Sequence, residues 1–445
     1  MPKNLFAYRS KPRTAPPRKD EVTDMLDLDH SPSKAEALQR LFDRWSPRPP
    51  VETVSLEDAL GRIPARDLHS LNTLPVVRAS MMDGIAVSSV SFRDGLPDTS
   101  RWQAGREYVR ADTGDDFDDR FDAVIPIEEV SFGPAGDLRL DGDVEVAPGA
   151  CVRPAGSAIR QGDLLVTAGL PLRSCDLAAL AIGGLVEIPV VRKPVVAFIP
   201  TGNELVPVGI PPRRGQNVEC NGLMARHLLR EMGASPLTFP IVEDRIEDLE
   251  YVLEQALQQA DIVVLNGGSS KGGEDLTATT LGRRGEVLVH GIAAGPGRPL
   301  CLALIGDTPV INLPGPVVAA FHGLDWCVRA IVSRYLRLPM PRRPRVRAVL
   351  AEDMPCPKKI CFLCRFHLAR SRTGGLVAHP LPFKSVSVGL WLNANGQFVS
   401  EIGEGDHRKG DILEVELLCG EEFIGLDGEE APRDLPAEIP SRQET

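Results

Sequence analysis

The sequence predicts a multidomain α/β protein whose largest domain contains a doubly wound sheet. Between residues 192 and 337, short β-branched runs alternate with segments of helical periodicity, and the runs end in loops rich in Gly and acidic residues. We expect strands near 195–199, 236–241, 261–265, 287–290 and 309–312, and helices near 222–232, 246–259 and 317–335. In a sheet of parallel strands, ligands bind at the carboxyl edge.

The composition limits the classes of partner. With 445 residues the chain has room for roughly three domains. Lys and Arg total 50 against 61 Asp and Glu, and this balance of −11 argues against binding to nucleic acid or to an anionic membrane. The apolar runs fall short of the roughly 20 residues that cross a bilayer. Nine scattered cysteines suit a reducing compartment, so we expect a soluble, cytoplasmic protein.

Outside the α/β domain, we expect further parts with distinct compositions. The segment SPSKAEALQRLFDRW opens a helix with a Ser cap, whereas the Asp-, Gly- and Val-rich stretch after residue 75 has no helical period. The Pro- and Arg-rich linker LPMPRRPRVR precedes several predicted strands. The expected parts are a disordered N-terminal tail (1–32), a discontinuous α+β N-terminal domain (33–75 and 150–191), an inserted β-rich lobe (76–149), the α/β domain (192–337), a C-terminal β-barrel (345–420) and an acidic tail (421–445).

Three cysteines form a C-x4-C-x2-C cluster, at Cys356, Cys361 and Cys364. Such a cluster suggests a metal or an iron–sulfur centre. The surrounding KKICFLCRFHL, however, is typical of a strand, on which residues three apart point to opposite faces. A shared metal is therefore not expected, and the role of the three thiols is left open.

A glycine-rich loop follows the third predicted strand of the α/β domain. Its backbone amides and the start of a helix near Leu276 suit an anion, although a plain tight turn would have the same composition. Its spacing matches neither a P-loop nor a dinucleotide-binding fingerprint. The candidate substrate-binding residues here are Gly267, Gly268, Ser269, Ser270, Lys271 and Gly272.

Acidic residues follow three predicted strands, at Glu204, Asp244 and Asp275. Three ionised carboxylates near a phosphate require a cation, and Mg²⁺ accepts carboxylate and phosphate oxygens. We predict that these acids hold Mg²⁺; the alternative is that each caps a helix or is solvated. Outside this domain, Asp83 lies on a predicted sharp turn in ASMMDGIAV and Thr113 precedes another strand, where the alternative is a Gly turn with surface acids.

Together these segments resemble the molybdopterin molybdenumtransferases, the molybdenum insertase family that includes MoeA and the gephyrin E domain. The resemblance covers roughly residues 33–420 and rests on five ordered motifs. SMMDGIAV is similar to the family's S-x-M-D-G-(Y/F)-A-V, TGNEL to T-G-(D/N)-E-L, and NGGSSKGGED to G-G-V-S-x-G-x-x-D. PGRP is similar to P-G-K-P, and LPGPVVAA to L-P-G-N-P-V-S-A.

The resemblance implies a function and a set of site residues. It implies four subdomains, a homodimer, and Mg²⁺-dependent insertion of molybdate into adenylyl-molybdopterin with release of AMP. It gives catalytic positions to Asp83, Thr113, Glu204, Asp244 and Asp275, and matches Pro314 and Gly315 to a proline loop and Ser385 to a barrel serine. Molybdate needs cations and N–H donors, for which Arg298, Lys384 and Ser385 are candidates.

The chain departs from the family pattern mainly by losing charge. Gly295 stands where a Lys is common, Arg298 replaces the second Lys, and Ser157 and Ala158 replace two acids. The motif LPGNP becomes LPGPV, at Pro316 and Val317. We hypothesise that Lys271 supplies the cation missing at Gly295; a solvated loop lysine is the alternative.

Other functions remain open on the sequence alone. One is the related adenylyltransferase of the same pathway, which the additional lobes argue against. Another is a catalytically weak paralogue that binds molybdopterin or finished cofactor as a carrier or scaffold and delivers it to a recipient molybdoenzyme or a partner adenylyltransferase. A tungstate-specific insertase is a further option, because the two oxyanions are nearly equal in size and charge.

Overall fold

The computed structural model describes residues 31–134, 136–142, 144–268, 276–372, 374–382 and 392–426. The chain forms two compact units: Pro50–Arg192 is one, and the segments before and after it make up the other. In the described residues no helix is long and apolar enough to cross a membrane. The complete set of domain boundaries expected from the sequence stays a prediction.

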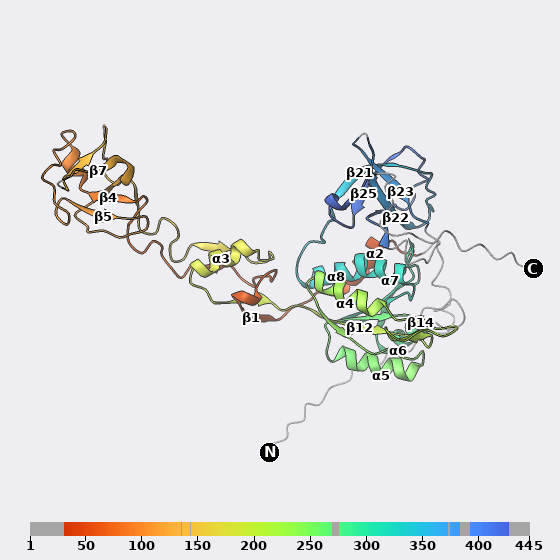
Figure 1. The fold of residues 1–445 in the computed structure, drawn as a ribbon. Helices are drawn as coiled ribbons and strands as arrows, with labels where there is room; N and C mark the ends of the chain where they lie inside the picture. Colours follow the sequence, from red (N-terminus) through yellow and green to blue (C-terminus); the bar gives the residue numbers. More distant parts are fainter. Residues whose placement is uncertain are drawn as a thin grey trace, which may run out of the picture. The chain divides into compact units, whose positions relative to one another are not determined.

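A six-stranded sheet forms the centre of the larger unit (Figure 1). In spatial order its strands are β15 (Ser235–Thr238), β12 (Val195–Pro200), β16 (Ile262–Asn266), β20 (Thr308–Leu313), β19 (Cys301–Ile305) and β17 (Glu286–His290). The first four are parallel, and β19 pairs antiparallel with both β20 and β17. The α/β prediction is confirmed, but the expectation of a purely parallel sheet missed β19, which forms a hairpin with β20 around Gly306.

Helices cover both faces of this sheet. Figure 1 shows α5 (Ile246–Leu257) and α6 (Leu276–Arg284) on one face, and α4 (Asn221–Glu231), α7 (Val317–Gly323) and α8 (Arg329–Tyr335) on the other. The helix expected over 317–335 is interrupted by a π-helical segment, η4 (Leu324–Val328). The small strands β13 (Leu205–Val206) and β14 (Asn217–Val218) pair with each other beside the sheet.

The helix expected at the start of the N-terminal domain lies instead on the α/β unit. This helix, α2 (Lys34–Arg44), begins with a capping box between Ser33 and Glu36, as the Ser cap predicted. It contacts β17 and β19, and the indole Nε1 of Trp45 donates to the carbonyl of Asp307 at 3.0 Å. Its buried apolar stripe is thus covered by the sheet edge, which the sequence pattern alone could not identify.

The C-terminal part of this unit forms a closed β-barrel, which confirms the prediction. Its strands are β21 (Arg345–Leu350), β22 (Cys361–Arg370), β23 (Leu376–Pro380), β24 (Gly396–Val399) and β25 (Ile412–Leu417), with the short η5 (Glu421–Phe423) after them. The ring closes because β22 pairs with both β23 and β24. The short β18 (Ala294–Gly295) extends from the α/β domain and pairs with β22.

In its described residues, the unit Pro50–Arg192 has two regions, the second of which contains two hydrophobic clusters. One surrounds the pairs β1 (Val51–Ser55) with β11 (Glu187–Val191) and β2 (Leu68–His69) with β10 (Leu164–Val166), together with η1 (Leu56–Asp58) and α3 (Ser174–Ile182). The other is β-rich and contains a sheet of β5 (Tyr108–Ala111), β4 (Gly84–Val87) and β6 (Ala123–Pro126). Around it lie β3 (Ala79–Ser80), β9 (Val152–Arg153), β7 (Val130–Phe132), β8 (Leu138–Leu140), η2 (Ser89–Phe92) and η3 (Ile127–Glu129).

Candidate functional site

The carboxyl edge of the sheet is held together by close backbone packing. The amide of Thr201, after β12, donates to Asn266 O at 2.9 Å, and the amide of Gly267, after β16, donates to Leu313 O at 3.0 Å. Gly267 has φ 126°, and a Cβ there would lie 2.2 Å from the carbonyl oxygen of Thr201. Only glycine fits this close approach, so the sequence-predicted Gly267 is required by the backbone itself.

Two buried hydroxyl groups lie beside the glycine turn. A Cβ on Gly268 would lie 2.3 Å from Thr277 Oγ1, so the turn packs directly onto the start of α6. Thr201 Oγ1 and Thr277 Oγ1 are buried and have no hydrogen-bond partner among the described residues. Buried hydroxyls without partners are costly, and a polar ligand at this edge would relieve that cost.

An asparagine pair fixes the proline loop that follows β20. The side-chain amide of Asn221 donates to Asn266 Oδ1 and to Gly315 O, both at 2.8 Å, and Asn266 Nδ2 donates to Pro314 O at 2.9 Å. Both asparagines are buried. Neither asparagine was predicted as a site residue; the available signal was an Asn at the end of a buried strand and another at the start of a helix.

The carboxylates of Glu204 and Asp244 lie close enough to influence each other. Burial, and then the negative charge of Glu204, raises the pKa of Asp244 above its ordinary value, although a hydrogen bond with Asn203 opposes this. Asp244 Oδ1 is buried without a hydrogen-bond partner in the part of the chain that the structure describes. A divalent cation would neutralise both acids and supply a partner to that oxygen, so the donors fit Mg²⁺. The third predicted ligand, Asp275, lies outside the described residues.

The loop that carries Arg298 borders a basic groove. The groove has a volume of about 420 Å³ and lies between residues 294–298 and residues 357–360 of the barrel segment. Besides Arg298 it is lined by Lys358 and Lys359. These two lysines were not predicted as site residues, because their only signal was that they are adjacent in sequence shortly before β22. Three basic side chains therefore border the groove.

Two largely buried side chains, Lys34 and His322, hold the loop that carries Arg298 in place through hydrogen bonds. Lys34 Nζ lies 2.5 Å from His322 Nε2, and His322 Nδ1 lies 2.9 Å from the carbonyl oxygen of Pro296. Burial, followed by the charge of Lys34, lowers the pKa of His322 to about 3, so the ring is neutral at pH 7. The geometry then requires His322 to donate from Nδ1 to Pro296 and to accept from Lys34 at Nε2.

Replacing Lys34 by Met is expected to change how stability depends on pH. Burial lowers the pKa of Lys34 below 10.5, so between the folded-state pKa and 10.5 the unfolded chain binds more protons than the folded chain. Relative to Lys34→Met, the wild type should therefore gain free energy of unfolding as pH rises through that window. Urea unfolding at a series of pH values measures the difference in free energy of unfolding between wild type and variant. Lys409→Met, at an exposed lysine, is the matched control. A difference for Lys34→Met that does not change with pH would contradict the buried contact between Lys34 and His322.

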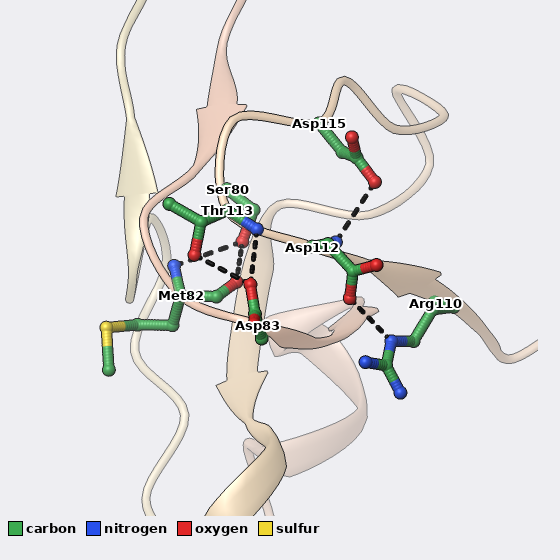
Figure 2. A network of polar contacts seen from close by, with 7 residues as sticks. All are labelled: Ser80, Met82, Asp83, Arg110, Asp112, Thr113 and Asp115. Carbon is green, nitrogen blue, oxygen red and sulfur yellow. Dashed lines mark hydrogen bonds and ion pairs between the residues drawn. The ribbon is translucent and has the colours of Figure 1, made fainter.

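Asp83 and Thr113 form a hydrogen-bonded pair in the unit Pro50–Arg192 (Figure 2). The backbone amide and the hydroxyl of Thr113 donate to Asp83 Oδ1 at 2.7 and 2.8 Å. Both bonds lower the pKa of Asp83, and the bond from the backbone amide has the larger effect. Ser80 Oγ fixes the turn by donating to Met82 O at 2.5 Å. Asp83 is thus held in its ionised form with a defined orientation.

Replacing Thr113 by Ala is expected to raise the pKa of Asp83 part of the way to its ordinary value. The substitution removes the hydroxyl donor but keeps the amide donor, which is the larger cause of the depression. Carboxyl carbon chemical shifts followed across an acid titration measure the change. In the same unit Ser131→Ala removes a comparable hydroxyl bond, to Asp141, and should leave the Asp83 titration as in wild type.

The remaining predicted residues divide into those the structure places and those it does not describe. Within the larger unit, Glu204 and Asp244 lie together, while Gly267, Gly268, Pro314 and Gly315 share the carboxyl edge. Seven predicted residues fall outside the described part of the chain: Ser269, Ser270, Lys271, Gly272, Asp275, Lys384 and Ser385. The arrangement can bind an anion at backbone amides and a cation at carboxylates.

The three cysteines of the cluster have different surroundings. Cys356 and Cys364 lie in the barrel core, whereas Cys361 lies next to Lys34. Burial raises the pKa of the Cys364 thiol to about 12. In the described residues no group of three or more His, Cys, Asp or Glu side chains could hold a metal ion.

Comparisons with known proteins agree with this architecture. Residues 33–184 match the profile of the MoeA N-terminal region (domain I and II), and residues 197–334 match that of a probable molybdopterin binding domain. The chain is 28% identical over 387 residues to a molybdopterin molybdenumtransferase of Bacillus subtilis, covering 83% of this chain and 90% of that protein. It is 29% identical over 323 residues to a molybdopterin molybdenumtransferase of Haemophilus influenzae, covering 70% of this chain and 78% of that protein. The structure of a molybdopterin biosynthesis moea protein from Pyrococcus horikosii superposes on this chain with a TM-score of 0.73 at 27% identity. The superposition covers 87% of this chain and 99% of that one.

Proposed function

This chain belongs to the molybdopterin molybdenumtransferase family, and we propose that it inserts molybdate into adenylyl-molybdopterin in a Mg²⁺-dependent reaction that releases AMP. Its role in molybdenum cofactor biosynthesis follows from its two matched domains and its relatives. The single observation that best supports the detailed reaction is the pair Glu204 and Asp244, in which one buried carboxylate oxygen has no hydrogen-bond partner among the described residues.

The carboxyl edge supplies the groups that a phosphoanhydride requires. The amide of the turn at Gly268 and the hydroxyls of Thr201 and Thr277 are suited to bind phosphate oxygens. Glu204 and Asp244, with Asp275 as the proposed third acid, would hold Mg²⁺. When bound, Mg²⁺ would neutralise phosphate charge that develops as the anhydride is cleaved.

The basic groove beside the Arg298 loop is proposed to receive molybdate. Arg298, Lys358 and Lys359 provide positive charge to a tetrahedral dianion, and Ser385 would add a hydroxyl donor. The neutral ring of His322 fixes the loop through Pro296 without placing further charge there. For Asp83 and Thr113 we propose catalytic positions in a homodimeric, cytoplasmic enzyme; the bond from Thr113 keeps Asp83 ionised.

A catalytically weak carrier or scaffold is the second candidate function. The loss of charge at Ala158 and Gly295, relative to the family pattern, favours it. The retained acids at Glu204 and Asp244 favour the enzyme. A carrier would bind molybdopterin or finished cofactor and deliver it to a recipient molybdoenzyme or a partner adenylyltransferase.

One experiment separates these proposals. Purified protein is incubated with adenylyl-molybdopterin, Mg²⁺ and either molybdate or tungstate, and AMP and metal-loaded pterin are measured. Release of AMP with molybdate, dependent on Mg²⁺, is the expected result. Binding of the pterin with no AMP released identifies a carrier, and turnover with tungstate alone identifies a tungstate-specific insertase.

A further inference from the structure

The proline loop that follows β20 has an exposed apex on a buried base. Gly315 and Pro316 are exposed, whereas Pro314 is buried. The two side chains that hydrogen-bond to the loop, Asn221 and Asn266, are buried as well. A Cβ added at Gly315 would meet no atom within 4 Å, so the apex borders open space. The reaction proposed above assigns no task to this apex.

Two carbonyl groups of the loop are bonded to the buried asparagines. Asn266 Nδ2 donates to Pro314 O at 2.9 Å, and Asn221 Nδ2 donates to Gly315 O at 2.8 Å. Asn221 Nδ2 also donates to Asn266 Oδ1 at 2.8 Å, which joins the two side chains. Because only the NH₂ group of an asparagine can donate to a carbonyl, these bonds also fix which way each amide faces. Both loop carbonyls are therefore held toward the protein interior.

The planar geometry of the peptide then sets the direction of the N–H at the apex. The peptide bond between Pro314 and Gly315 is trans, so its N–H points away from its carbonyl. Since that carbonyl is bonded to Asn266, the Gly315 N–H is directed toward the exposed side of the loop. Pro314 and Pro316 have no N–H. Among the described residues the Gly315 N–H has no hydrogen-bond partner.

Both asparagines stand against the local preferences of their elements. Asn near a helix start commonly caps its own helix, but in α4 the amide of Gly222 is capped by Glu219. The Asn221 side chain bonds instead to a residue 94 positions away. Asn is depleted in strands, yet Asn266 ends β16, which is buried throughout. Such breaks of local preference are expected at functional sites, where the side chain serves another part of the molecule.

We propose that Asn221 and Asn266 are positioning residues that aim the Gly315 N–H at an anionic oxygen of the substrate. This role rests on the proposed function, to which it adds a backbone donor. An N–H that is already aimed requires no reorganisation when negative charge reaches it, and an anionic oxygen is its strongest acceptor. The phosphate groups of adenylyl-molybdopterin and molybdate are the two sources of such an oxygen, and separate titrations distinguish them.

Two substitutions at the apex separate the N–H from the side chain. Gly315 does not have a positive φ, so it accepts an L residue. Gly315→Ala adds a Cβ in open space and keeps the N–H, whereas Gly315→Pro also removes the N–H. Relative to Gly315→Ala, Gly315→Pro should lower kcat/KM for AMP release roughly tenfold to a hundredfold, the effect of losing one hydrogen bond to a charged group. Equal kcat/KM in the two variants would overturn the proposal.

Nuclear magnetic resonance tests the same donor without turnover. In protein labelled with isotopic glycine, the amide signal of Gly315 is the one that disappears in Gly315→Ala. Without Mg²⁺, the protein is titrated separately with AMP, adenylyl-molybdopterin and molybdate, and the ligand that supplies the oxygen should move this signal downfield. A shift with AMP or adenylyl-molybdopterin identifies phosphate as the source, and a shift with molybdate alone identifies the oxyanion. No shift with any of the three would refute the donor.

A substitution of Asn266 tests the positioning itself. Asn266→Ala keeps the Gly315 N–H but releases the carbonyl of Pro314, so the ligand-induced shift should shrink. We expect kcat to fall about tenfold to a hundredfold while KM changes less than about threefold, because the donor is misplaced rather than lost. A variant that only lowers the Tm, with kcat and the shift as in wild type, would show a purely structural role and contradict the proposal.

Asn395→Ala is the matched control for a lost asparagine. In the barrel, Asn395 Oδ1 accepts from the amide of Leu368 at 2.6 Å and its Nδ2 donates to the carbonyl of Leu368 at 2.9 Å. This variant should lower the Tm but leave kcat and the Gly315 shift as in wild type. Equal losses of kcat in Asn395→Ala and Asn266→Ala would mean that general destabilisation explains both.

Failure of this role and failure of the proposed reaction give different results. A protein whose Gly315 signal shifts with a ligand but that releases no AMP would contradict the reaction and leave the donor standing. A protein that releases AMP equally well as Gly315→Pro and as Gly315→Ala would keep the reaction and lose the donor.

Discussion

Replacing Asp244 by Asn is expected to reduce AMP release by about 10²–10³-fold, a loss typical for removing one electrostatic contact to a transition state. The substitution takes away a charged ligand proposed for Mg²⁺ while keeping the size of the side chain. Because burial and Glu204 raise the pKa of Asp244, its ionised form costs free energy in the folded protein at neutral pH. The variant should therefore melt at or above the wild-type Tm.

The combination of lost activity and kept stability distinguishes a ligand-binding acid from a structural one. Mg²⁺ should raise the Tm of the wild type and leave that of Asp244→Asn unchanged, as linkage requires for a ligand of the folded state. The neighbouring Glu243, whose side chain is 69% exposed, provides the control Glu243→Gln, which should keep activity and the Mg²⁺ response. If both variants lost activity equally, or neither did, the assignment of Asp244 would be wrong.

Replacing Gly267 by Ala is expected to destabilise the α/β domain by roughly 2–4 kcal/mol and to abolish binding of adenylyl-molybdopterin. A Cβ would lie 2.2 Å from the carbonyl oxygen of Thr201, and the residue has φ 126°. The turn must move away from β12 to relieve the overlap, which displaces its amides. Urea unfolding and titration with the pterin substrate measure the two effects.

Gly215 is a control position that separates the effect of steric overlap from the effect of a left-handed backbone conformation. It has φ 85°, yet a Cβ there would meet no atom within 4 Å. Gly215→Ala should therefore cost only about 1 kcal/mol, the strain of a left-handed conformation, and leave substrate binding intact. Equal losses in the two variants would mean that the approach of Gly267 to Thr201 plays no special part.

The fold was largely predictable because its signals are local. The periodicity of α4 and α5 and the β-branched runs of β12 and β16 each depend on short stretches of sequence. The strand β19 was missed because a Gly- and Pro-rich loop precedes it and its antiparallel direction depends on a hairpin with β20. The position of α2 was missed for a different reason: an apolar stripe requires burial but does not specify the partner.

The residues of the candidate site that come directly after parallel strands could be predicted from the sequence. Glu204 and Asp244 were found because acids after parallel strands share an edge. The pairs Asn221 with Asn266, and Lys34 with His322, were not found, since their partners are 45 and 288 residues apart in the chain. Contacts at such separations depend on the finished packing, which no local pattern encodes.

The surroundings of Gly295 constrain what a longer side chain at this position could do. A Cβ at residue 295 would lie 2.9 Å from Ile360 Cδ1 and 3.3 Å from the ring of Phe362. A Lys at position 295 would therefore meet side chains of the barrel segment, and its effect would depend on the residue at position 360. Substitutions at positions 295 and 360 should accordingly be non-additive, because the two residues are neighbours.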